Sequence, residues 1–213
     1  MNFQELIEIV GDEPLFETGL LLAGDVKPAE VRRQLSRWTK AGRLYQLRRG
    51  LYALAPPYRK ARPHPFLIAN HMVRGSYVSL QSALAFYGLI PEQAPIITSV
   101  TTARPGHWET PLGNYDFRHI KTELFRDYCL TDLDNTQQAF IATPEKALLD
   151  LVYLQADADS PLYLRELRLQ HLETINVPVL QGQAHISGSP KLKRAADIIA
   201  NMAETEANDY ETL

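Results

Sequence analysis

The sequence predicts an α+β fold with a small N-terminal domain and a larger C-terminal domain that holds a small sheet. Three observations lead to this prediction. A helical pattern followed by a short hairpin pattern lies within residues 1–55. A proline-rich stretch, residues 56–64, then interrupts regular structure, because proline fixes φ and lacks an amide hydrogen. In residues 65–213, helix and strand patterns do not alternate strictly, which favours α+β over α/β.

The N-terminal domain is predicted to begin with two short helices. Phe3 to Val10 carries apolar residues with the 3.6-residue period of an amphipathic helix. Glu17 to Leu22 is predicted as a second, shorter helix, and Gly24-Asp25 as the turn that follows it.

A third helix and a hairpin complete the predicted domain. Pro28 suits the first helical turn, and Gly42 is expected to end the helix. Its apolar stripe consists of Val31, Leu35 and Trp38. Leu44 to Leu54 is predicted as a hairpin that turns at Arg49-Gly50. The polar side of the helix and the hairpin turn supply the candidate DNA-binding residues Lys27, Arg32, Arg33, Ser36, Arg37, Lys40, Arg48 and Arg49.

Positive charge is confined to one part of the chain. The formal net charge is −3, but the window from Lys27 to Arg62 holds eleven cations and one acid, Glu30. From residue 63 onward there are eleven cations and eighteen acids. A cationic helix followed by a cationic hairpin within such a window indicates a winged helix-turn-helix that binds double-stranded DNA. Arg59, Lys60 and Arg62 of the linker are predicted either to follow a phosphate backbone or to serve solubility alone.

The C-terminal domain is predicted to mix helices with a few strands. Ser79 is expected to cap a helix that Gly88 ends, and Thr143 to cap another that starts at Pro144. A loop rich in glycine and proline is expected between the first two strands, and residues 204–213 are expected to fray. The other predicted helices cover 66–73, 162–172 and 190–203, and the predicted strands cover 96–102, 115–120 and 138–142.

Several function classes lack their residue patterns. The single cysteine, Cys129, excludes an intrachain disulfide framework, and the spacing of the six histidines predicts no metal site. We find no glycine-rich phosphate loop and no nucleophile elbow, so neither catalytic residues nor a cofactor are predicted. No secretory signal and no apolar run of about 18 residues is present, which predicts a cytoplasmic protein without membrane contact.

Three segments resemble one known family. They are LSRWTKAGRLYQLRRGLYAL in the first domain, YVSLQSALAFYGLIPE at residues 77–92 and FIATPEKALLDLVYL at residues 140–154. In this order and at these spacings the chain resembles the AbiEi family, the antitoxins of type IV toxin–antitoxin systems, which are also described as transcriptional regulators of viral defence. The resemblance covers residues 3–155, about three quarters of the chain.

The resemblance implies an N-terminal winged helix that represses its own operon by binding inverted repeats. It also implies a C-terminal domain that counters a nucleotidyltransferase-type toxin without needing a stable complex with it. Gly50 would hold the turn of the wing, and Tyr52 would pack beneath it. The matching positions of the second domain, whose role we expect to be structural, are Ser79, Ser82, Pro144, Glu145, Lys146 and Asp150.

Two other functions compete with this hypothesis. In one, the second domain is an enzyme that modifies or neutralises the toxin, with Lys146 and Asp150 in an acidic pocket. In the other, the basic helix binds an acidic protein partner instead of DNA.

Overall fold

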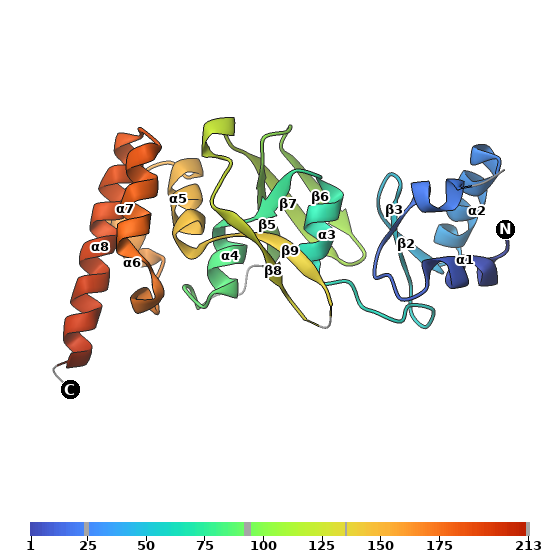
Figure 1. Ribbon diagram of the computed structural model, residues 1–213, viewed down its shortest axis with the longest axis horizontal. Helices are drawn as coiled ribbons and strands as arrows, with labels where there is room; N and C mark the ends of the chain where they lie inside the picture. Colours follow the sequence, from blue (N-terminus) through green and yellow to red (C-terminus); the bar gives the residue numbers. More distant parts are fainter. Residues whose placement is uncertain (24–25, 92–94, 135, 212–213) are drawn as a thin grey trace.

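The computed structural model describes residues 1–23, 26–91, 95–134 and 136–211 as an elongated α+β protein (Figure 1). An N-terminal unit lies at one end, a six-stranded sheet in the middle and a group of C-terminal helices at the other end. The predicted turn Gly24-Asp25 lies outside the described residues. The N-terminal elements are α1 (Phe3–Val10), β1 (Phe16–Glu17), the 3₁₀ helix η1 (Thr18–Leu22), α2 (Pro28–Lys40), β2 (Leu44–Arg48) and β3 (Leu51–Leu54).

Local sequence explains where the first helices begin and end. Asn2 and Glu5 form a reciprocal capping box that starts α1. Pro28 occupies the first turn of α2, and Gly42 follows the helix with a φ of +70°, which glycine adopts without strain. The predicted second helix is a 3₁₀ helix that begins one residue later, because Glu17 belongs to strand β1 instead.

In the N-terminal sheet, which has the order β1-β3-β2, the central strand β3 is buried on both faces. Along β3, Tyr52 and Leu54 pack with α1 and α2, whereas Leu51 and Ala53 join the apolar core of the middle of the molecule. Side chains of a strand alternate between faces, so a strand covered on both sides has a continuous apolar sequence, here LYAL. The N-terminal unit therefore packs against the rest of the protein through its sheet.

The proline-rich linker is attached to both of its neighbours. Tyr58 packs edge-on against Phe3 of α1 with ring centroids 4.9 Å apart. Lys60 forms a 2.9 Å ion pair with Asp12. At the other end, the Gln137 side chain holds the linker backbone by two hydrogen bonds. The segment is thus an ordered connection.

The middle of the molecule is a mixed sheet in the order β6-β7-β5-β4-β9-β8. It is larger than the predicted sheet, because three of its strands are not predicted from the sequence. These are β4 (Ser76–Val78), β6 (Gly106–Thr110) and β8 (Tyr128–Asp132). The loop expected from its glycines and prolines is partly wrong, since β6 lies within it and pairs antiparallel with β7. The predicted strands are β5 (Ile96–Thr101), β7 (Gly113–His119) and β9 (Gln138–Ala142).

Helices α3 (Pro65–Met72), α4 (Leu80–Phe86) and α5 (Pro144–Leu154) pack on this sheet (Figure 1). Thr143 caps α5 as expected, accepting a hydrogen bond from the Lys146 amide at 3.3 Å. The expected side-chain cap by Ser79 is wrong. Its hydroxyl donates instead to the buried carboxylate of Asp150. A buried polar group without a hydrogen-bond partner is costly, which favours this contact over a cap.

The C-terminal helices differ most from the predicted ones. The helix expected at 162–172 stops at Glu166, and the chain then forms the 3₁₀ helix η3 (Leu172–Thr174). The last helix continues through the residues expected to fray. The helices of this part are α6 (Pro161–Glu166), α7 (Val177–Ile186), which was not predicted, and α8 (Pro190–Glu211). Helices α7 and α8 pack on each other and on α5.

Among the described residues, no helix combines the length and the apolar character needed to cross a membrane.

Candidate nucleic-acid interface

Helix α2 presents a face rich in basic residues to solvent, on which Glu30 and Gln34 lie next to Arg33 and Arg37. Its apolar stripe of Val31, Leu35 and Trp38 is buried against the N-terminal core, at 3%, 0% and 3% exposure. The 3.6-residue period therefore turns the remaining side chains outward. The exposed candidate residues on or next to the helix are Lys27, Arg32, Arg33, Ser36, Arg37 and Lys40.

The arginines of this basic face form no ion pair with the acids of the described residues. Within the described parts of the chain, Arg32, Arg33 and Arg37 take part in no ion pair. The helix lies at the end of the molecule opposite α8 (Figure 1). A long, flat partner can therefore approach it without meeting the acidic C-terminal half.

The scaffold beneath the basic face is rigid. Phe3 packs on Trp38 with ring centroids 5.3 Å apart, and the Arg43 guanidinium lies 5.0 Å from the centre of the Phe3 ring. These contacts fix α2 relative to α1 and to the start of the hairpin. A face held in this way presents its arginines in a defined register.

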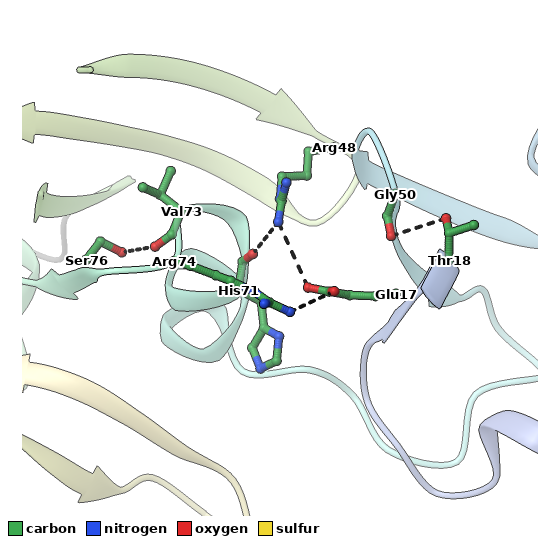
Figure 2. Close-up of polar contacts among 8 residues, drawn as sticks. All are labelled: Glu17, Thr18, Arg48, Gly50, His71, Val73, Arg74 and Ser76. Atoms are coloured by element: carbon green, nitrogen blue, oxygen red, sulfur yellow. Dashed lines mark hydrogen bonds and ion pairs between the residues drawn. The ribbon is translucent and has the colours of Figure 1, made fainter. Parts of the chain in front are cut away.

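The hairpin turn meets helix α3, so the two hairpin arginines differ. The Arg48 guanidinium donates a 3.2 Å hydrogen bond to the carbonyl of His71 and lies 4.0 Å from the Glu17 carboxylate (Figure 2). Glu17 also holds Arg74 at 2.8 Å. We call these four residues the interdomain polar contact. Arg48, a candidate DNA-binding residue from the sequence, therefore has a hydrogen-bond acceptor and an acid beside it in the folded protein.

Arg49 is the exposed cation of the turn. Gly50, with a φ of +86°, permits the turn, and its carbonyl accepts a 2.9 Å hydrogen bond from the Thr18 amide. The Thr18 hydroxyl donates to the same carbonyl at 3.4 Å (Figure 2). Tyr52 is buried and stacks on Phe16 with ring centroids 5.7 Å apart. The turn is therefore anchored from below while Arg49 points to solvent.

Sequence reasoning missed the partners of Arg48. Glu17 and His71 lie 54 positions apart in the chain, and neither belongs to a recognisable motif. Arg48 Nε and Glu17 Oε1 are buried without a hydrogen bond among the described residues. The pairing of β1 with β3 places Glu17 beside Arg48, and the approach of the hairpin to α3 adds the His71 carbonyl.

The matching positions of the second domain form a buried network. Lys146 donates to one Asp150 oxygen at 2.5 Å, while Tyr77 and Ser79 donate to the other at 3.0 and 2.8 Å. Burial raises the pKa of the Asp150 carboxyl, against the opposite effect of Lys146 and the two hydroxyls. The same burial, with the neighbouring Asp150, raises the pKa of the Tyr77 hydroxyl.

The other matching positions are also engaged inside the protein. Glu145 accepts a 2.9 Å hydrogen bond from the Asn176 amide, which joins α5 to α7. Ser82 exchanges hydrogen bonds with Thr98 of β5. Pro144 occupies the first turn of α5. Ser82 thus joins α4 to the sheet, and Glu145 joins α5 to the start of α7.

A very small cavity adjoins the buried network. It has a volume of about 10 Å³ and is lined in part by Lys146, Asp150 and Gln183. Such a space holds about one water molecule, and the unpaired Gln183 Oε1 is a polar group that a water can satisfy. A larger molecule reaches Lys146 or Asp150 only if the surrounding helices move. In the described ranges, no three metal-ligating side chains cluster.

A comparison of the sequence with known protein families and with curated proteins finds no match.

Proposed function

We propose that this protein is a DNA-binding transcriptional autorepressor. The exposed basic face of α2 carries the proposal, because its arginines are unpaired among the described residues and the buried apolar stripe holds them in register. A helix of this kind lies in the major groove, where arginine reads guanine and also contacts phosphates.

The arrangement around α2 supports a winged helix-turn-helix. A 3₁₀ helix precedes α2 and a two-stranded hairpin follows it, with β1 completing the sheet. In this proposal α2 is the recognition helix and Arg49 is the hairpin cation that contacts the backbone. Arg48 is assigned a positioning role, since it is already engaged with His71 and Glu17.

We further propose that the operator is an inverted repeat in the chain's own operon and that the C-terminal part is a type IV antitoxin. This part of the proposal rests on the AbiEi resemblance of residues 3–155. The partner is then a nucleotidyltransferase-type toxin, which the protein counters without a stable complex.

A salt titration tests the DNA-binding proposal. The full chain is mixed with a labelled duplex that carries the region upstream of its own reading frame, and the affinity is measured at several salt concentrations. Neutralising Z phosphates gives a slope of about −0.9Z in log K against log salt. If Arg32, Arg33, Arg37 and Lys40 each neutralise one phosphate, the expected slope is about −3.6, and further contacts make it steeper.

The same measurement distinguishes DNA binding from the competing function, in which the basic face binds an acidic protein. A scrambled duplex of equal length serves as the control. Tighter binding to the upstream duplex, with a steep slope on both, supports the proposal. A flat slope, or no binding to either duplex at low salt, overturns it.

A further inference from the structure

A second basic feature lies between the N-terminal unit and the six-stranded sheet. It is a cleft of about 320 Å³ walled by three parts of the chain. Tyr45 of β2 lines one side, the linker lines another, and the β6–β7 turn at Pro111 and Leu112 closes the third. This volume is at the lower end of the range of small-molecule sites.

The linker backbone that carries Arg59 and Arg62 into this cleft is held in place. The amide of Arg59 donates to the carbonyl of Ala55 at 3.3 Å. The Gln137 side chain donates to the Arg62 carbonyl at 3.0 Å and accepts from the His64 amide at 2.8 Å. Both arginines therefore stand on fixed backbone, which lowers the entropy lost when they bind a ligand.

The charges in the cleft are not balanced by the protein. Lys60, between the two arginines in sequence, is paired with Asp12. Neither Arg59 nor Arg62 forms an ion pair with any residue that the structure describes, and no acid lines the cleft. The two arginines line one cleft without a carboxylate, so a bound anion would meet positive charge that the protein leaves uncompensated.

We propose that this cleft binds a phosphate group, either on a small ligand of mononucleotide size or on the backbone of bound DNA. Guanidinium groups bind phosphate oxygens by paired, charge-assisted hydrogen bonds. Tyr45 and the linker prolines provide an aromatic and apolar wall for an attached base or sugar. Only the second of these two sources rests on the proposed DNA-binding function.

Calorimetric titration of the full chain with 5′-AMP, adenosine and inorganic phosphate tests the first source. The double variant Arg59→Gln with Arg62→Gln removes both guanidiniums. Lys60→Gln is the matched control, because it removes one charge from the same segment outside the cleft. Binding of AMP is expected to weaken at least about tenfold in the double variant, to stay unchanged in Lys60→Gln, and to exceed adenosine binding at least about tenfold.

Duplex binding by the same variants tests the second source. If the cleft holds a DNA phosphate, the double variant lowers the salt slope by about 2 while AMP fails to bind. Circular dichroism of each variant checks folding, which exposed Arg62 and half-buried Arg59 are not expected to affect. The proposal is overturned if the double variant binds AMP and duplex as the unchanged chain does, or if AMP up to about 10 mM gives no signal and the duplex slope does not change. The AMP titration needs no DNA, so it remains informative if the proposed operator binding fails.

Discussion

The basic face of α2 and the turn of the β2–β3 hairpin look alike in sequence but differ in the folded protein. Arg32, Arg33 and Arg37 are exposed and unpaired among the described residues, whereas Arg48 lies between Glu17 and the His71 carbonyl. The sequence alone therefore does not show whether a basic residue binds a ligand or stabilises the fold. The role of a basic residue depends on the hydrogen-bond acceptors and acids that tertiary packing brings near it. Each prediction below separates an effect on ligand binding from an effect on stability.

The largest effect is expected where a cation is wholly engaged. Lys146→Met removes the cation of the buried pair and leaves the Asp150 carboxyl buried without its charged partner. Losing one partner of such a pair costs about 3–5 kcal/mol of unfolding free energy. Urea denaturation followed by circular dichroism measures it. Arg37→Met is the matched control and should change stability by no more than about 0.5 kcal/mol. Equal midpoints for the two variants would show that the buried pair does not stabilise the fold.

The free cations of α2 should act on DNA binding alone. Arg33→Ala and Arg37→Ala are each expected to lower the affinity for the operator by about 1–3 kcal/mol, because each removes a contact to a base edge. Their melting temperatures should match that of the unchanged chain. Mobility-shift assays with the upstream and the scrambled duplex measure the effect. Equal losses on both duplexes would assign these arginines to phosphate contacts only.

The interdomain polar contact should show the opposite behaviour. Arg48→Ala removes a charged hydrogen-bond donor from the His71 carbonyl and a neighbour from Glu17, at a site that is about one third exposed. A loss of about 1 kcal/mol in stability is expected, at the low end for a charged hydrogen bond because solvent screens the site. Thermal melting of the full chain measures it. Arg48→Ala with an unchanged melting temperature but weaker DNA binding would return Arg48 to the DNA interface.

The smallest effect is expected at Arg49. It is exposed beside Arg48, so Arg49→Ala should leave the melting temperature unchanged and lower the salt slope of duplex binding by about 1. Comparing this variant with Arg48→Ala separates the two neighbours in one experiment. If Arg49→Ala binds duplex with the same salt slope as the unchanged chain, the hairpin is not part of the proposed DNA interface.

Some of the structure follows from local sequence alone. The amphipathic period fixes α1 and α2, because one apolar face must leave water, and capping or proline residues fix the start of α5. The hairpin at residues 44–54, with its turn at Arg49-Gly50, is also predicted from the sequence, and it forms strands β2 and β3. The exposed cations of α2 follow directly from the same period that buries Trp38.

Other elements depend on distant neighbours. Strand β4 has three residues and lies between β5 and β9, so its strand conformation comes from its partners. Strand β6 carries the glycine and proline neighbours of a loop, but pairs with β7 along five positions. Helix α8 is predicted only to Ala203 by its apolar period and continues to Glu211 in the fold.

By itself, the sequence determined the basic face of α2, its apolar stripe, the hairpin and the division of charge between Lys27–Arg62 and the remainder. These features depend on residues a few positions apart, and local geometry connects them. Only the tertiary structure decided that Arg48 meets His71, that Lys146 and Asp150 are buried with Tyr77 and Ser79, and that Arg59 and Arg62 share a cleft with Tyr45. Lys146 and Asp150 share α5, and Arg59 and Arg62 share the linker. The other residues in these contacts come from different elements, and no local pattern specifies which distant side chains packing will bring together.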